Sequence, residues 1–556
     1  MDHSNRRGFL KQAGVAAAFW ALPVNETQSG VRKKSPEYTS RVPKYTFAGT
    51  LPEQQEQLKT NPLILRFIES RQKMAADPYR PVYHYVNPEN RLNDPNGLCF
   101  WKGRWHLFYQ GYPPEDPRQH WGHAVSDDLI HWRDLPYAIY PNPERCCFSG
   151  STFVEKDRVI AMYHGTEVGN MVAVSDDPLL LNWKKVTGRA VIPINRDESV
   201  PPYRVFDPCI WKKGGTYYSL SAGTLPGPGG KRVRANFLFR SKDLAKWEYL
   251  HPFVEDDRYS LVGDDGACPY FWPIGDKHIL LHFSHMSGGK YLLGDYDTRR
   301  DKFVVAGGGD FNFGPHAPAG VHAPSATPDG KGGVIVIFNM NPGKPTKGWN
   351  QIMTLPRRLT LAPRDKLNEL RIEPAGDIES LRYDHRHVDA MNLPANEELV
   401  LGNIKGNAME IAAEIYPRNA QVVEMNVLRS PDRQEFTRIM FFKNRGYRHR
   451  EYGRTHALSR KYDSVITVDS SRSSVLPDVR SRAPETAPVF IEKDEVLRLR
   501  VFVDKSVVEA FVNGKQCVAM RVYPGRSDSL GVSLRSQGSS ASLKSLGAWQ
   551  MRNIYV

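Results

Sequence analysis

The sequence of 556 residues lacks several features that mark whole classes of protein. No run approaches the ~18 consecutive apolar residues of a membrane-spanning helix, so we expect no membrane span. Six cysteines are too few for a disulfide scaffold, and the adjacent pair Cys146 and Cys147 has poor geometry for bridging each other. Helical periodicity is scarce, so helices should be few and short.

The composition is that of a chain with a large core. Apolar residues make up 40% of it and aromatic residues 11%, which excludes a disordered or fibrous protein. At roughly 100–200 residues per domain, the length predicts two or three domains.

Basic residues are in excess, with 75 Lys and Arg against 61 Asp and Glu and a formal net charge of +14. Half of this excess lies in residues 429–461, which contain ten Lys or Arg and three Asp or Glu. No nucleic-acid-binding motif accompanies the segment, so we expect no nucleic-acid partner. We interpret it as a solvated basic face, with an anionic polymer or an envelope surface as alternative partners.

The first residues have the pattern of a targeting signal. Arg6 and Arg7 precede a modestly apolar run from Ala13 to Leu22, which ends at Pro23. Twin arginines before a short apolar segment resemble a signal of the twin-arginine export type. We predict that residues 1–24 form this signal and that the protein is periplasmic or extracellular; a frayed basic terminus is the alternative. Residues 25–79 are expected to be an N-terminal extension or linker.

A repeated unit follows, in which a turn residue precedes a short apolar and aromatic strand. The five turns lie 54, 57, 61 and 57 residues apart. Units of this length, each one small antiparallel sheet, are typical of a β-propeller. We therefore predict a five-bladed β-propeller over residues 80–370; a stacked β-solenoid, which normally has a shorter period, is the alternative. The turn residues are Gly103, Asp157, Gly214, Gly275 and Gly332.

The second half of the chain continues with strands but without the repeat. Apolar residues alternate from Leu497 to Val503, as in a half-buried strand. The pair Asn513-Gly514 is a strong hairpin-turn signal between two further strands. We expect residues 385–556 to form a β-sandwich, so the predicted fold is all-β: a five-bladed β-propeller followed by a C-terminal β-sandwich.

Acidic residues precede three of the five repeat turns: Asp94, Asp207 and the pair Asp264-Asp265. If the strand before each turn is the innermost of its blade, these side chains converge on one central cavity. Converging carboxylates can cleave a glycosidic bond, because one protonates the leaving oxygen while another attacks or stabilises the oxocarbenium-like centre. Clustered Asp could also bind metal, but matching His or Cys spacing is missing, so we expect no metal or cofactor.

Seven motifs occur in the order seen in the invertase and fructanase family, glycoside hydrolase family 32, which the chain resembles over about residues 80–556. A late run, Phe502-Val503-Asp504-Lys505-Ser506 with Glu509, resembles the family's C-terminal sandwich. The resemblance implies a five-bladed propeller plus sandwich that releases β-fructosyl units with retained configuration. The motifs are Asn93-Asp94-Pro95-Asn96-Gly97, Phe108-Tyr109-Gln110, Trp121-Gly122-His123-Ala124, Phe148-Ser149-Gly150-Ser151, Asp207-Pro208, Cys268-Pro269 and Leu355-Pro356-Arg357.

The resemblance also implies residue roles. Asp94 would be the nucleophile of a covalent fructosyl-enzyme, and Asp207 would stabilise the developing charge. Cys268 would pack beside the site, and Asp504 and Glu509 would be structural. Trp121 and Phe148 could alternatively belong to the core of a blade. The residues implied to line the fructosyl subsite are Asn93, Gln110, Trp121, Phe148, Ser149 and Trp349.

Two positions depart from the family pattern. The family has Arg immediately before the stabilising Asp, where this chain has Phe206, and an acid/base Glu immediately before Cys-Pro, where it has Ala267. Side chains two residues apart in a strand point to the same face, so Asp265 could supply the acid if the backbone is extended through Gly266. Asp264 is the next candidate, since a bulge at Gly266 would bring it round instead.

Together these features predict an exported glycoside hydrolase that acts with retention on β-fructosides, such as sucrose or fructans. Its expected partner is an oligo- or polysaccharide substrate. The alternatives are a sugar-binding protein of the same fold without turnover, a fructosyl transferase, and a propeller that serves only protein interaction.

Overall fold

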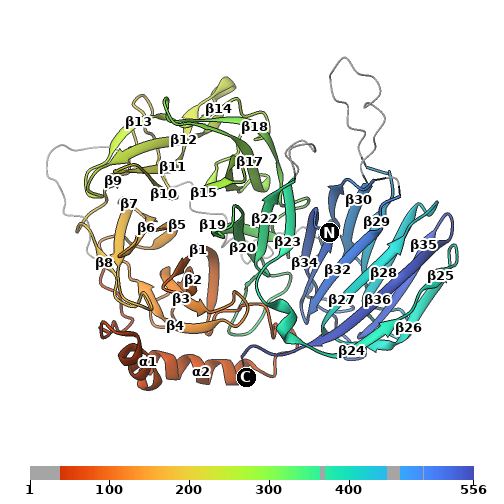
Figure 1. Cartoon of the computed structure of the whole chain (residues 1–556). Coiled ribbons are helices and arrows are strands. Elements are labelled where there is room, and N and C mark those ends of the chain that lie inside the picture. Colours follow the sequence, from red (N-terminus) through yellow and green to blue (C-terminus); the bar gives the residue numbers. More distant parts are fainter. Residues whose placement is uncertain (1–37, 363–369, 447–463, 493, 556) are drawn as a thin grey trace, which may run out of the picture. The chain divides into compact units, whose positions relative to one another are not determined.

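A computed structural model describes residues 38–555 except 363–369, 447–463 and 493 (Figure 1). The expected export signal at residues 1–24 and residues 447–461 of the basic segment lie outside the described residues. Strands dominate, and the two α-helices of the described part are α1 (Leu51–Thr60) and α2 (Pro62–Met74). Asn61 caps α2 by accepting hydrogen bonds from the N–H groups of Leu63 and Ile64. Neither helix has the length and apolar character needed to cross a bilayer.

Residues 91–374 form five sheets in chain order, which Figure 1 shows around a common centre. The first sheet contains β1 (Arg91–Trp101), β2 (Arg104–Tyr112), β3 (His120–Ser126) and β4 (Arg133–Ile139). The second contains β5 (Cys147–Val154), β6 (Val159–Gly165), β7 (Gly169–Ser175), β8 (Lys184–Lys185) and β9 (Ile192–Pro193). The third contains β10 (Pro208–Lys213), β11 (Thr216–Pro226), β12 (Arg232–Ser241) and β13 (Glu248–Pro252).

The last two sheets complete this part of the chain. The fourth contains β15 (Ala267–Ile274), β16 (Lys277–Ser284), β17 (Gly288–Asp297), β18 (Lys302–Asp310) and β14 (Val254–Glu255), which pairs in parallel with β18. The fifth contains β19 (Val321–Pro328), β20 (Val334–Met340), β21 (Ile352–Met353), β22 (Arg357–Leu361) and β23 (Leu370–Pro374).

The first strands of these sheets, β1, β5, β10, β15 and β19, form a closed ring. Each contacts the next in this order, and β19 contacts β1. Every repeat turn identified in the sequence joins the first two strands of its sheet, so the turn predictions are confirmed. The residues before each turn therefore lie on the innermost strands.

The hydroxyl of Tyr270, on β15, ties the inner strands together. It accepts a hydrogen bond from the N–H of Gly97 at 3.2 Å and lies 2.9 Å from both the carbonyl of Gly150 and the hydroxyl of Ser325. Tyr270 is 2% exposed. One buried hydroxyl thus joins the first strands of four sheets and fixes the spacing of the ring.

Two further sheets form the sandwich, and both contribute to one apolar core. The larger contains β24 (Arg382–Val388), β25 (Met391–Leu393), β27 (Ala408–Tyr416), β32 (Leu497–Asp504), β33 (Val507–Val512), β34 (Gln516–Arg521) and β36 (Ala541–Met551). The smaller contains β26 (Glu398–Lys405), β28 (Val422–Arg429), β29 (Thr437–Phe442), β30 (Ser464–Asp469), β31 (Glu485–Val489) and β35 (Gly531–Gln537).

The predicted strand and hairpin near the C-terminal end are confirmed. The alternating apolar residues of β32, from Leu497 to Val503, are all buried. Asn513 and Gly514 have φ angles of 52° and 63°, the left-handed values of a two-residue hairpin turn, and they join β33 to β34.

A buried charged network links this sandwich to the sheets before it. The carboxylate of Asp504 accepts hydrogen bonds from the N–H groups of residues 82–84. Glu509 accepts from His84 Nε2 at 3.1 Å and from Arg357 Nη2, on β22, at 2.8 Å. The structural role predicted for Asp504 and Glu509 is confirmed by these contacts.

Candidate active site

The N-terminal ends of the five innermost strands bring a cluster of polar side chains together. Asp94 lies on β1, Ser149 on β5, Cys268 on β15 and His322 on β19, while Asp207 immediately precedes β10. Each comes within the first few residues of its strand, so all lie at one end of the ring.

The two carboxylate oxygens of Asp94 have different surroundings. Its Oδ2 accepts hydrogen bonds from Ser149 Oγ at 2.7 Å and Gln110 Nε2 at 3.2 Å. Its Oδ1 lies 3.1 Å from His322 Nδ1 but accepts no hydrogen bond of good geometry from any described residue. Burial opposes ionisation, but the nearby His322 and the Ser149 hydroxyl outweigh it and lower the pKa of Asp94.

Asp207 is a second carboxyl group, and its pKa is shifted in the opposite direction from that of Asp94. Its Oδ2 accepts the backbone N–H of Cys268 at 3.0 Å. Burial and the adjacent charge of Asp94 nevertheless raise the pKa of Asp207 to about 7. The thiol of Cys268 lies 3.6 Å from an oxygen of each carboxylate, so one sulfur atom bridges the pair. Neighbouring carboxyl groups whose pKa values are pushed apart are a signature of acid–base and glycosidic chemistry.

Most of the residues predicted to bind sugar lie beside Asp94. Asn93 Nδ2 donates to Gln110 Oε1 at 3.2 Å, and Gln110 Nε2 donates to Ser149 Oγ at 2.8 Å. Phe148 precedes Ser149 and is half-buried. The structure therefore joins Asn93, Gln110 and Ser149 to Asp94 in one hydrogen-bonded network.

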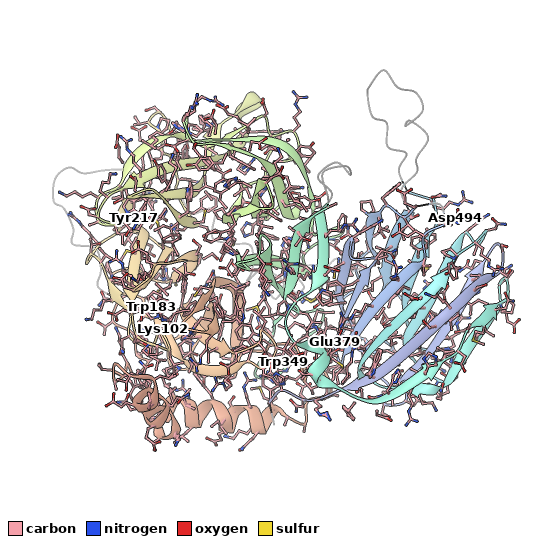
Figure 2. All side chains as sticks on the ribbon, viewed as in Figure 1. Lys102, Trp183, Tyr217, Trp349, Glu379 and Asp494 are labelled. Carbon is pink, nitrogen blue, oxygen red and sulfur yellow. The ribbon has the colours of Figure 1, made fainter. Side chains whose placement is uncertain are left out.

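The two tryptophans predicted to line the same subsite lie elsewhere. Trp121 is fully buried, and its indole N–H donates to the carbonyl of Phe148 at 2.9 Å, so it supports the network from the core rather than lining the subsite. Trp349, labelled in Figure 2, is 2% exposed and donates to Asp77 at 2.7 Å. It lies beside a pocket that Asn90 and Arg91 also line. Large apolar rings gain more from core burial than from exposure at a polar cavity.

The two acidic candidates before Cys268 have different surroundings. Asp264 is buried and accepts from the hydroxyls of Ser284 at 2.7 Å and Ser287 at 2.6 Å, so it is committed to holding a loop. Asp265 accepts from His285, through the ring Nδ1 at 2.6 Å and the backbone N–H at 3.2 Å. The extended backbone assumed through Gly266 is wrong, because its φ is +66°.

The two positions that depart from the family pattern lie in one apolar cluster. Ala267 is 1% exposed and packs with Cys268, Phe283 and Ala323, and Phe206 packs against the same group. Phe206 and Ala267 thus belong to one cluster, whose own side chains carry no charge.

Three histidines that the sequence motifs did not indicate lie beside this cluster. The rings of His285, His316 and His322 lie 5.4, 5.3 and 4.3 Å from the ring of Phe283. His322 was visible in the sequence as the residue before Ala323-Pro324 near the fifth repeat turn, where the first strand of that sheet starts. His285 follows the end of β16 and carried no local motif.

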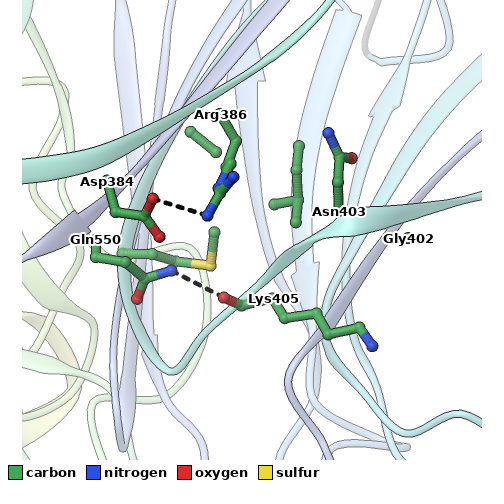
Figure 3. A pocket seen from close by; sticks show the side chains of 9 residues that line it. Asp384, Arg386, Gly402, Asn403, Lys405 and Gln550 are labelled. Atoms are coloured by element: carbon green, nitrogen blue, oxygen red, sulfur yellow. Dashed lines mark hydrogen bonds and ion pairs between the residues drawn. The ribbon is translucent and has the colours of Figure 1, made fainter.

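A separate pocket lies in the sandwich (Figure 3). Its carboxylate, Asp384, forms an ion pair of 2.9 Å with Arg386, and Gln550 donates to the carbonyl of Lys405 at 2.8 Å. A carboxylate paired with an adjacent guanidinium is neutralised and poorly suited to proton transfer. The cluster around Asp94 is therefore the candidate active site.

Replacing Gly266 with Ala is expected to disturb both stability and activity. A left-handed φ costs a non-glycine residue roughly 1–2 kcal/mol, and the new Cβ would overlap the side chain of Arg234, adding about 1–3 kcal/mol of overpacking. Urea denaturation and kcat/KM on the same preparation measure the effect. Gly103→Ala is the control, because Gly103 also has a positive φ but open space around it. Equal losses in both variants would contradict a role for close packing at Gly266.

Comparison with known proteins gives the same architecture. Residues 84–374 match the model of the glycosyl hydrolases family 32 N-terminal domain, and residues 377–550 match that of the family's C-terminal part. A levanase of Bacillus subtilis (strain 168) is 27% identical, covering 86% of this chain and 71% of that protein. A sucrose-6-phosphate hydrolase of Escherichia coli is 28% identical, covering 86% of this chain and 96% of that protein.

Solved structures agree with this result. Fructan 1-exohydrolase IIa from Cichorium intybus superposes with a TM-score of 0.72 at 22% identity, covering 86% of this chain and 98% of that one. The exo-inulinase from Aspergillus awamori gives 0.68 at 20% identity, covering 86% and 99%. The fold is therefore all-β, with an N-terminal β-propeller and a C-terminal β-sandwich, and the protein is a glycoside hydrolase. By its match over both domains, the chain belongs to glycosyl hydrolase family 32.

Proposed function

We propose that this enzyme hydrolyses β-fructosides, of the sucrose or fructan class, with retention of configuration. The observation that carries the proposal is the pair of carboxyl groups bridged by the Cys268 thiol, of which Asp94 has a lowered pKa and an Oδ1 that accepts no hydrogen bond of good geometry from any described residue. Relatives named as a levanase and a sucrose-6-phosphate hydrolase support this substrate class.

Asp94 acts as the nucleophile in this mechanism. Its anchored Oδ2 fixes the carboxylate plane, and its free Oδ1 attacks the anomeric carbon to form a fructosyl ester. Asp207, once ionised, accepts hydrogen bonds from sugar hydroxyls and stabilises the positive charge that develops on the ring. Asn93, Gln110 and Ser149 bind the fructosyl group.

Further parts of the proposal concern its proton transfer, architecture and destination. Asp265 lies on the side from which the leaving oxygen receives its proton. In the second step, the attacking water gives up a proton on the same side. Each of the five sheets between residues 91 and 374 is one blade of a five-bladed propeller, within a catalytic domain of about residues 80–370. The twin-arginine pattern at residues 1–24 directs export. The sandwich domain, expected at residues 385–556, includes all of β24 (Arg382–Val388).

The proposal is tested by incubating the purified protein with sucrose, levan, inulin and shorter fructosides. We expect release of reducing sugar from at least one of them, and NMR at early times should detect β-fructofuranose as the first product, because two displacements at one carbon retain configuration. Release of the α-anomer would contradict the covalent mechanism. Binding of all these sugars without release would instead support a sugar-binding protein.

A further inference from the structure

The proposed reaction needs a proton donor, and two of the positions expected to supply it, Ala267 and Asp264, do not. Ala267, immediately before Cys268, carries no acidic group and lies in the apolar cluster with Phe206. Asp264 is held by two serine hydroxyls and the N–H of Leu261, which lower its pKa against the opposing effect of burial. It is therefore ionised at neutral pH, with Oδ2 bound to the N–H of Leu261 in its own loop and Oδ1 bound to Ser284 and Ser287.

Asp265 is coupled to a side chain that can hold the proton. Its Oδ2 lies 2.6 Å from Nδ1 of His285, within hydrogen-bond distance of the ring. The backbone N–H of His285 donates to the other oxygen, Oδ1, at 3.2 Å. A carboxylate bound in this way fixes the orientation of the ring and leaves Nε2 as its second proton-bearing atom.

We propose that His285, oriented by Asp265, is the general acid and base of this enzyme, donating from Nε2 the proton that the leaving oxygen receives. This rests on the proposed fructoside hydrolysis. The side chain of His285 is 64% exposed, so it is accessible from solvent, and its ring lies 6.3 Å from that of His322, which contacts Asp94.

The surrounding charges suit this role. The hydrogen bond to Asp265, followed by the charges of Asp265, Asp94 and Asp207, raises the pKa of His285 to about 9. The neighbouring His316 has its pKa lowered to about 4 by burial and by the charges of His322 and His285, so it stays neutral. His285 is thus protonated at neutral pH while His316 is not.

The two half-reactions balance. In the first, Asp94 Oδ1 forms a bond to the anomeric carbon, the glycosidic C–O bond breaks, and the Nε2 proton of His285 passes to the leaving oxygen. In the second, Nε2 takes a proton from water, the water oxygen bonds to the anomeric carbon, and the ester bond to Asp94 breaks.

The charge of Asp94 would help to reverse the role of His285 between these steps. Asp94 loses its negative charge when the ester forms, and that charge is one of the causes that raise the pKa of His285. The pKa of His285 therefore falls in the intermediate, which favours its neutral form as a base. The charge returns with hydrolysis of the ester.

The test compares His285→Gln with wild type on two β-fructosides, one with a poor alkyl leaving group and one with an activated aryl leaving group. We expect kcat/KM on the alkyl substrate to fall by about 10²–10⁴-fold, the usual contribution of a general acid, and to change little on the aryl substrate. In wild type, kcat/KM for the alkyl substrate should decline above about pH 9, and this decline should be absent in the variant.

A second variant tests the role of Asp265 without removing the donor. Asp265→Asn removes the main cause of the raised pKa, so the alkaline decline should move down toward the ordinary histidine value of about 6.5. His131→Gln is the matched control, because His131 forms a 2.6 Å pair with Asp128 away from this cluster and should leave both substrates unaffected.

The outcomes separate the inference from the proposed function. A wild type that cleaves no β-fructoside overturns both. An active wild type with equal losses on the two substrates, or none, in His285→Gln overturns the inference alone. If Asp207 were the donor, activity would decline above pH 7, and His285→Gln would keep the wild-type dependence on leaving group. That result would also overturn the inference about His285.

Discussion

Replacing Asp94 with Asn is expected to lower kcat for fructoside hydrolysis by at least ~10⁴-fold, the scale on which loss of a catalytic nucleophile is measured. The amide keeps the size of the side chain and can still accept from Ser149, so folding and sugar binding should survive. It has no anionic oxygen to form the ester, so the first displacement stops. Initial rates of fructose release at saturating substrate, with KM from the same data, measure the effect.

A control variant distinguishes loss of the catalytic step from a general effect of replacing a carboxylate with an amide. Asp389→Asn changes a carboxylate that is 98% exposed in the sandwich and should leave kcat unaltered. In Asp94→Ala, added azide can enter the space of the missing carboxylate and attack the anomeric carbon. Turnover should then be restored, and the product, a fructosyl azide, should have inverted configuration because only one displacement has occurred. Undiminished hydrolysis by Asp94→Asn would remove Asp94 from the role of nucleophile.

Short patterns in the sequence were sufficient to predict much of the fold. Each repeat turn carries glycine or aspartate and is followed by an apolar strand, and these signals are contained within about ten residues. Because five copies have nearly equal spacing, they fix which strands are equivalent and so place Asp94 and Asp207 at the same end of the ring. The hairpin at Asn513-Gly514 was predictable for the same reason.

The acid–base pair was not predictable because it depends on a backbone irregularity. Gly266 and Cys268 both have positive φ angles, and the pairing of β15 with β16 shifts between Ala267 and Tyr270. Counting residues along an ideal hairpin therefore misplaces the partner of Asp265. In the observed register Ala267 faces Phe283, and the backbone N–H of His285 donates to Asp265 at 3.2 Å.

The burial of aromatic side chains also could not be predicted from the sequence, which is why Trp121 was expected to line the sugar subsite. Trp121 belongs to a motif whose neighbours surround Asp94, and sequence order cannot distinguish a ring that lines a cavity from one that packs beneath it. In the structure Trp121 lies against Phe108 and Tyr163 at ring distances of 5.6 and 5.5 Å. Apolar packing on both sides of the ring decides its position.

The largest expected effect on stability is at the buried network around Glu509. Glu509→Gln should lower the free energy of unfolding by about 3–5 kcal/mol, because it leaves the buried guanidinium of Arg357 without its counter-charge. Arg357 is 1% exposed, and its Nη2 donates to Glu509 at 2.8 Å. Urea denaturation followed by tryptophan fluorescence measures the loss. The surface pair Glu56–Lys59 is the control, where Glu56→Gln should cost less than about 1 kcal/mol.

The dependence of this loss on pH follows from two opposite pKa shifts. Burial opposes ionisation of Glu509, but Arg357 and His84 outweigh it and lower its pKa to about 2, so its contribution is complete above the ordinary carboxyl value and disappears as pH falls toward 2. Burial also opposes charging of His84, yet Asp504 and Glu509 raise its pKa, so that contribution is complete at low pH and disappears as pH rises through the raised value. The difference between wild type and Glu509→Gln should therefore be greatest between these limits and shrink in acid. A difference that stayed constant down to pH 2 would show that Glu509 acts through packing rather than charge.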